Sequence, residues 1–297
     1  MSKTSDGLRE EWSRNDALRD SGLKTPEDIV RFDNISYGSD EKWNLLDVYR
    51  PRDKAVYPVI IIVHGGAWVY GTKETYQFFG MNLAQHGFGV VNYTYRLAPE
   101  HKFPAQLKDT NAAVKWTLEC AGEYGLDASR LALIGDSAGA QILGLYLSAC
   151  TNADYMSHFD FSLPGNLRPA AAVFNCGVYE MLYSSVIGER EDRELIGDIL
   201  SDGEESLELL QVTANMTEGF PSCFVASGVG DFMEPQVELM CSHLRRLNIY
   251  HESKIYGSAK NPLYHNFELN IDDAQGKLCR DEECEFIKRM IGIEKGE

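Results

Sequence analysis

The stretch RLALIGDSAGAQILGLYLSA, residues 130–149, decides the fold of this chain of 297 residues. It begins as an apolar strand, passes through G-D-S-A-G and continues as an apolar helix, which is the context that a G-x-S-x-G motif requires. Gly135 and Gly139 flank the serine because the turn is sharp, and their small size lets the Oγ of Ser137 stand above the carboxyl end of a sheet. Ser137 is therefore the candidate nucleophile.

Short apolar runs recur along the chain with helical stretches between them, and this alternation is typical of an α/β sheet with mostly parallel strands. The third predicted strand is apolar on both faces, as in the centre of a parallel sheet, whereas the first two are partly polar and suit an antiparallel edge. Eight strands are predicted, at 31–37, 44–49, 59–63, 89–95, 131–135, 170–176, 223–227 and 251–256.

Helices are predicted after Pro104 and Pro235, because proline is favoured in the first turn of a helix, and a final helix is predicted with Asp272 as its cap. We expect a single domain over residues 1–297, with helices on both faces of the sheet. Two segments lie outside the alternation and are predicted to form a small cap or lid: 1–30, with a helix start at Thr25 and Pro26, and 179–219.

A serine hydroxyl is a poor nucleophile near neutral pH, so it needs a base within hydrogen-bond reach and an acid that orients the base. Asp231 follows the seventh predicted strand and His265 the eighth, in the order Ser, Asp, His that this arrangement uses. If residues 135–139 were only a glycine-rich turn before a helix, the presence of Asp231 and His265 after the later strands would remain unexplained. Asp136 and Glu234 are alternatives for the acid, and we favour Asp231 because of its place at a strand end.

The sequence HGGAW, residues 64–68, follows the central apolar strand, where backbone N–H groups can face the oxygen that becomes negative in a tetrahedral intermediate. It predicts an oxyanion hole, whose residues are Gly65, Gly66, Ala67 and, directly after the nucleophile, Ala138. We expect Gly66, Ala67 and Ala138 to be the donors. We expect His64 to hold the loop without touching the substrate.

Aromatic residues gather after this loop and at the start of the second cap segment. They are predicted to wall an apolar pocket for an acyl or aryl group, although packing of the sheet against its helices is an equally good explanation for most of them. The candidate substrate-binding residues are Trp68, Tyr70 and Tyr179, and the wider aromatic cluster also holds Tyr76, Phe78 and Phe79.

The formal charge is −17, from 28 Lys and Arg against 45 Asp and Glu. Such a charge repels phosphate backbones and anionic lipids, so neither nucleic acid nor membrane is an expected partner. Nothing resembles a signal peptide or a membrane span. Seven cysteines without a C-x-x-C pair argue against a disulfide framework and a zinc site, and the predicted location is the cytoplasm. We expect no metal and no cofactor, and association into a homo-oligomer stays open.

Together these motifs resemble the hormone-sensitive-lipase-like carboxylesterase branch of the α/β-hydrolase superfamily, with similarity also to bacterial esterases and arylformamidase-type enzymes. The likeness is carried by HGGAW, by YRLAPEHKFPAQLKD at 95–109 and by GDSAGA at 135–140, and downstream by SGVGD at 227–231 and YHNF at 264–267. The resemblance implies the α/β-hydrolase fold and the triad Ser137, Asp231 and His265. Ala67 departs from it, because a third glycine is usual there.

The predicted function is hydrolysis of small carboxylic esters through an acyl-enzyme intermediate. The same apparatus serves two alternatives, an aryl formamide or amide hydrolase and a peptidase. A third alternative is a small-molecule receptor that keeps the pocket and has lost the chemistry, although no triad residue is missing here. A nucleotide-binding domain would need a glycine-rich phosphate loop after its first parallel strand, and VIIIVHGGAWVYG at 59–71 is not one.

Overall fold

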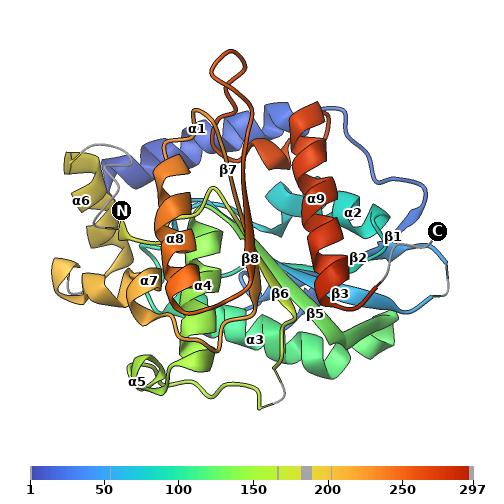
Figure 1. The fold of residues 1–297 in the computed structure, drawn as a ribbon, viewed down its shortest axis with the longest axis horizontal. Helices are drawn as coiled ribbons and strands as arrows, with labels where there is room; N and C mark the ends of the chain where they lie inside the picture. Colours follow the sequence, from blue (N-terminus) through green and yellow to red (C-terminus); the bar gives the residue numbers. More distant parts are fainter. Residues whose placement is uncertain (1, 54, 166, 182–188, 202, 294–297) are drawn as a thin grey trace.

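The central sheet has eight strands in the order β1-β2-β4-β3-β5-β6-β7-β8 (Figure 1). The structure is a computed structural model that describes residues 2–293 except 54, 166, 182–188 and 202. The strands are β1 Ile29–Ser36, β2 Leu45–Pro51, β3 Tyr57–Val63, β4 Gly89–Tyr93, β5 Leu126–Asp136, β6 Ala171–Asn175, β7 Ser222–Gly228 and β8 His251–Tyr256. All eight predicted strands are confirmed.

The sheet is antiparallel only at one edge, where β1 pairs with β2 and β2 with β4, and every other pairing is parallel. Residues Val59–Val63 of β3 are fully buried, because helices cover both faces of a central parallel strand. The carboxyl ends of β5, β7 and β8 therefore meet at the same edge of the sheet, which is where the sequence places Ser137, Asp231 and His265.

Helices cover both faces of the sheet (Figure 1). One face carries α3 Ala105–Cys120, α4 Ala138–Thr151 and α8 Glu234–Arg246, and the other carries α2 Gln77–Gln85 and α9 Ala274–Met290. The helices predicted after Pro104 and Pro235 are α3 and α8. The shorter helices are η1 Lys73–Tyr76, η2 Ala121–Tyr124, α5 Ala153–Met156, η4 Gly203–Leu210, α7 Val212–Asn215 and η5 Phe267–Leu269.

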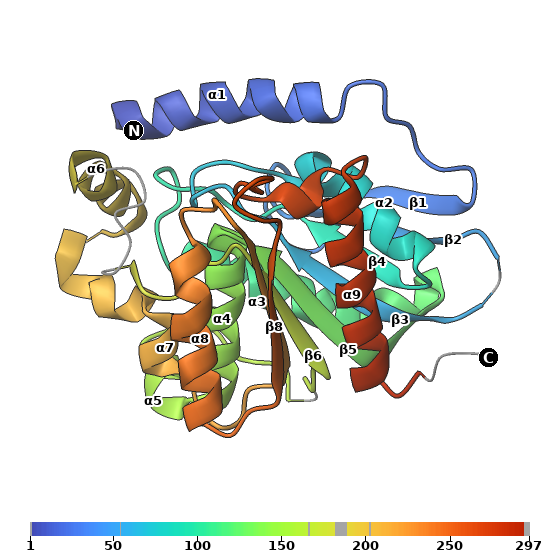
Figure 2. The same ribbon diagram turned by 45° about the horizontal axis from the view of Figure 1, so that its top comes forward.

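The two segments outside the alternation contribute α1 Lys3–Arg19 and α6 Glu189–Ile199. Figure 2 shows α1 along one side of the molecule, with α6 beside its N-terminal end. Hydrogen bonds between described residues join them: the amide of Ser2 and the hydroxyl of Ser5 donate to Asp198, and Thr4 donates to Glu194. The part of the predicted cap at 182–188 and 202 lies outside the described residues.

Two predictions about helix ends are wrong. Thr25 and Pro26 start no helix, because β1 begins at Ile29 and leaves room only for a turn in which the Ile29 amide donates to the Pro26 carbonyl. The cap of α9 is Asp273 and not Asp272, since the carboxylate of Asp273 accepts from the amides of Gln275 and Gly276. Adjacent aspartates give the same sequence signal, and only the backbone turn selects between them.

Candidate active site

Ser137 lies at the sharp turn between β5 and α4, with φ 51° and ψ −122°, a conformation that a residue with a side chain adopts only when its surroundings impose it. Its amide donates to the Asn175 carbonyl at 2.8 Å, which ties the turn to the end of β6. A Cβ at Gly139 would lie 2.1 Å from the Val63 carbonyl oxygen, so only glycine allows α4 to start this close to β3. The local sequence thus forces the serine outward.

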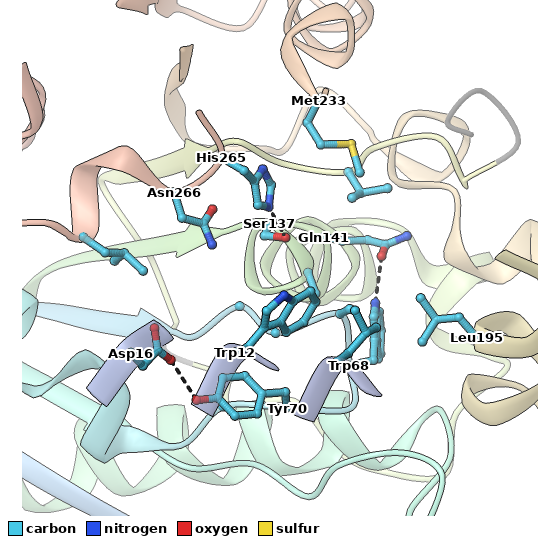
Figure 3. A pocket seen from close by; sticks show the side chains of 18 of the residues that line it. Trp12, Asp16, Trp68, Tyr70, Ser137, Gln141, Leu195, Met233, His265 and Asn266 are labelled. Atoms are coloured by element: carbon cyan, nitrogen blue, oxygen red, sulfur yellow. Dashed lines mark hydrogen bonds between the residues drawn. The ribbon is translucent and has the colours of Figure 1, made fainter. Parts of the chain in front are cut away.

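His265 stands between the serine and the aspartate. Its Nε2 lies 2.8 Å from the Oγ of Ser137, and its Nδ1 lies 2.9 Å from an oxygen of Asp231 (Figure 3 shows the contact with the serine). The Phe232 ring stacks on the imidazole with centroids 4.5 Å apart. Because a carboxylate only accepts hydrogen bonds, Nδ1 carries the proton and Nε2 is free to accept one from the serine. The structure therefore brings the three predicted catalytic residues together.

Asp231 is held as an ionised carboxylate. Burial alone would raise its pKa, but the hydrogen bond and charge of His265 and the amide of Met233 outweigh burial, so the pKa lies below its usual value. The Met233 amide donates at 3.0 Å and the Ser227 hydroxyl at 2.7 Å, which fixes the carboxylate between β7 and α8. Glu234, one of the alternatives for the acid, is exposed at the start of α8.

Asp136, the other alternative, faces the loop after β3, and among the described residues it makes no hydrogen bond to the imidazole. It accepts from the Tyr76 hydroxyl at 2.6 Å and from the Gly65 amide at 3.1 Å. Burial raises the pKa of Asp136 to about 6. The geometry makes Asp136 an anchor for the start of the HGGAW loop.

The HGGAW loop and the start of α4 present backbone amides to the pocket. Among the described residues, no hydrogen bond uses the amides of Gly66, Ala67 or Ala138, whereas the Gly65 amide is already bonded to Tyr76 and Asp136. Of the four predicted residues, three therefore have an amide available for an oxyanion. Gly66 has φ 116° and a Cβ there would lie 2.1 Å from the Tyr70 carbonyl oxygen, so the loop requires glycine at that position.

His64 supports this loop from below. Its ring is fully buried and stacks on Tyr95 with centroids 3.8 Å apart, and its Nδ1 donates to the Gly65 carbonyl at 2.8 Å. Burial lowers the pKa of His64 to about 4, so the ring is neutral near pH 7. His64 is absent from the pocket wall, as the sequence analysis expected.

A pocket of about 520 Å³ opens above Ser137 and His265. Figure 3 shows Asp16 and Asn266 on one side of the serine and Trp68, Gln141 and Leu195 on the other. Much of the lining is apolar, from Leu8, Val178, Met181, Leu195, Ile196, Ile199 and Met233.

Two of the three predicted substrate-binding residues line the pocket, and the third lies in the core. Trp68 and Tyr70 line the pocket, but Tyr179 does not: it is fully buried against Phe174, with ring centroids 5.9 Å apart. Its neighbours Val178 and Met181 line the pocket instead, because the chain runs along the wall and turns the tyrosine inward. The wider aromatic cluster divides as well, with Tyr76 in the lining and Phe79 in the core.

The lining contributed by α1 was not predicted from the sequence, and it comprises Leu8, Trp12, Asn15, Asp16 and Arg19. Leu8 and Trp12 are four residues apart and so lie on one face of the helix, a signal that was present in the sequence. Gln141 was also missed. It is fully buried one turn after Ser137, accepts from the Trp68 indole at 2.9 Å and donates to the Leu210 carbonyl at 2.8 Å.

One group of side chains among the described residues has the spacing of metal ligands. The Sγ of Cys176, an oxygen of Asp231 and a nitrogen of His265 lie within 4.8 Å of one another. Burial raises the pKa of the Cys176 thiol well above its usual value, so the thiolate that a metal needs is disfavoured. Asp231 and His265 are also bonded to each other, and the arrangement suits a triad better than a metal centre.

Comparisons with known proteins agree with this architecture. Carboxylesterase NlhH of Mycobacterium tuberculosis is 39% identical over 131 residues, covering 40% of each chain. A probable isoprenylcysteine alpha-carbonyl methylesterase, ICMEL1 of Oryza sativa subsp. japonica, is 26% identical over 228 residues, or 69% of this chain and 50% of that protein. The chain thus spans half or less of the length of these relatives.

Solved structures match almost the whole chain. Esterase B of Lactobacillus rhamnosis superposes with a TM-score of 0.88 at 19% identity, over 97% of this chain and 95% of that one. An esterase of Pyrobaculum calidifontis superposes with a TM-score of 0.77 at 22% identity, over 98% and 94%. In the described residues no helix has the length and apolar character needed to cross a bilayer. The BD-FAE family model matches residues 46–239, so the chain belongs to the BD-FAE family, with the fold of the hormone-sensitive-lipase-like α/β-hydrolases.

Proposed function

We propose that this chain is a serine esterase that hydrolyses small carboxylic esters. One observation carries the proposal: the hydrogen-bonded series from Ser137 through His265 to Asp231 opens onto a pocket that is also lined by Gly66, Ala67 and Ala138, whose amides make no hydrogen bond among the described residues. That combination supplies a nucleophile, a base and an electrophilic site. The esterase names of the relatives in sequence support the same assignment.

The reaction starts with attack of the Ser137 Oγ on the ester carbonyl, while the Nε2 of His265 accepts the hydroxyl proton. The negative oxygen of the tetrahedral intermediate accepts hydrogen bonds from the amides of Gly66, Ala67 and Ala138. The C–O bond then breaks, and the departing alcohol takes the proton from His265. Water attacks the acyl-enzyme by the same route, giving the free acid and restoring Ser137.

The pocket supports a short acyl or aryl group. Its volume of about 520 Å³ must hold both the acyl and the alcohol part of an ester, and its apolar lining includes Leu195 and Ile199 in α6. In this proposal, α1 and the described parts of the segment 179–219 form the cap over the site. All seven cysteines are unpaired, which supports a reducing compartment and hence the cytoplasm as the place of action.

An activity screen tests the proposal. Nitrophenyl esters of graded acyl length and an aryl formamide are offered to the protein and to Ser137→Ala, and release of nitrophenol or aryl amine is followed. The proposal expects turnover of short-chain esters that is lost in the variant. Turnover of the formamide in preference to every ester would reassign the enzyme to amide chemistry, and binding without turnover would support a receptor.

A further inference from the structure

The candidate oxyanion loop has an unfavourable backbone conformation. Three successive residues have positive φ: Gly66 at 116°, Ala67 at 48° and Trp68 at 69°. Side-chain-bearing residues adopt such angles only when surrounding contacts over-determine them. Two of the three amides proposed to hold the oxyanion, those of Gly66 and Ala67, belong to this stretch. Whatever holds the loop therefore also holds the oxyanion hole.

The N-terminal helix supplies one of the contacts that hold the loop. The Nε of Arg9 donates to the Val69 carbonyl at 2.6 Å, and its Nη2 donates to the Ala98 carbonyl at 2.8 Å. The Ala98 amide in turn donates to the Trp68 carbonyl at 3.0 Å. One guanidinium thus bridges the loop to the segment after β4, and it fixes two successive loop carbonyls, one directly and one through Ala98.

The guanidinium is itself positioned by a carboxylate. Glu100 accepts from Nη1 at 2.9 Å and from Nη2 at 2.8 Å, the bidentate geometry in which arginine holds a fixed orientation. The side chain of Arg9 remains 25% exposed, and it is not part of the pocket wall. Arg9 can therefore be replaced without removing a core residue or a substrate contact.

We propose that Arg9 is a positioning residue that keeps the oxyanion loop in its left-handed conformation, an inference that rests on the proposed hydrolase function. Without Arg9, the carbonyl of the buried Val69 loses the one side chain that donates to it among the described residues. The loop relaxes, and the Ala67 amide turns away from the oxyanion. Since the oxyanion develops only in the transition state, the loss falls on kcat and leaves KM nearly unchanged.

The test compares four variants for kcat and KM on the best nitrophenyl ester, with active sites counted by the endpoint of phosphonate labelling. Arg9→Met is expected to lower kcat per site by roughly tenfold or more, since misplacing or removing an oxyanion donor costs up to about 10²–10³. Arg9→Lys keeps one donor and should fall between Arg9→Met and the wild type. Glu100→Gln loosens the guanidinium but leaves its bond to the Val69 carbonyl, so it should lower kcat less than Arg9→Met does. Arg14→Met, whose partner is Glu10 on the same helix, should stay within about twofold.

A fifth variant distinguishes loop positioning by Arg9 from docking of α1. Asp198→Ala removes the bonds from Ser2 and Ser5 that hold the other end of α1, without touching the loop. Because Leu8 and Trp12 line the pocket, poorer docking should raise KM and leave kcat unchanged. An Arg9→Met protein with wild-type kcat, or with a change in KM alone, would overturn the proposal.

The rate of phosphonate labelling keeps this result distinct from a failure of the proposed function. Phosphonylation of Ser137 uses the same oxyanion contacts as ester hydrolysis but needs no physiological substrate. If the wild type hydrolyses no ester yet is labelled, a labelling rate that is roughly tenfold slower in Arg9→Met supports the positioning role, and equal rates refute it. A wild type that is neither active nor labelled overturns both proposals.

Discussion

Replacing Glu283 by glutamine should make the free energy of unfolding depend less on pH. Glu283 lies on α9 and is fully buried, and its Oε1 accepts from the Cys279 thiol at 3.0 Å. Burial raises its pKa from 4.5 to about 7, only partly offset by that hydrogen bond and by the charge of Arg280. The folded protein therefore keeps a proton on Glu283 at pH values where the unfolded chain has lost it.

The size of the effect follows from this difference in pKa. At 1.36 kcal/mol for each pH unit, the interval between 4.5 and about 7 corresponds to about 3 kcal/mol. Between these values the folded state binds more protons than the unfolded state, so the free energy of unfolding falls as the pH rises through the interval. An uncharged glutamine does not titrate, and its oxygen can still accept from Cys279.

The assay is urea unfolding of both proteins at intervals from pH 4 to pH 8. Glu283→Gln should gain roughly 1–3 kcal/mol over the wild type at pH 8, and the two proteins should converge towards pH 4. Glu282→Gln is the matched control on the same helix. Its hydrogen bonds from Lys254 and Tyr256 outweigh its burial and lower the pKa of Glu282, so that variant should lose stability above pH 5. Parallel pH curves for Glu283→Gln and the wild type would refute the reasoning.

Three further predictions concern turnover. Asp231→Asn should lower kcat by roughly 10³–10⁴, because the imidazole tautomer is no longer fixed, whereas Glu234→Gln should leave kcat unchanged, and the reverse result would reassign the acid. Gly66→Ala should lower kcat by roughly tenfold or more, since its Cβ would lie 2.1 Å from the Tyr70 carbonyl oxygen, and a fully active variant would exclude this loop as the oxyanion hole. Across acetyl to palmitoyl esters, kcat/KM should be highest at short chains, because each methylene contributes up to about 0.8 kcal/mol only while it finds an apolar wall. An optimum at long chains would mean that the cap opens further than the pocket indicates.

The sheet and the three proposed catalytic residues could be predicted from the sequence because their signals are local. Ser137 and Asp231 follow the apolar strands β5 and β7, His265 follows the edge strand β8, and parallel strands bring their carboxyl ends to one edge of a sheet. Short motifs therefore predicted that residues far apart in the sequence lie close together in the fold. The glycines of the two turns carried the same kind of information, since the close backbone approach at Gly139 leaves no room for another residue.

The cap could not be predicted in the same way. Helix α1 is attached through polar contacts of Ser5, Arg9 and Arg19 as well as through Leu8 and Trp12, and these two apolar residues form too narrow a stripe to predict its packing. The prediction that Tyr179 lines the pocket was wrong because, along an irregular segment, neighbouring side chains point in different directions and no periodic pattern shows which of them faces the core. The availability of the Gly65 amide likewise depends on Tyr76 and Asp136, which are 11 and 71 positions away.

Labelling with a fluorophosphonate, followed by mass spectrometric mapping of the modified peptide, tests the central claim most directly. The account predicts a single modification, on Ser137, in the folded wild type, and no modification in Ser137→Ala with an unchanged circular dichroism spectrum. Modification of any other residue, or labelling that persists in Ser137→Ala, would contradict the assignment of Ser137, His265 and Asp231 as the catalytic triad.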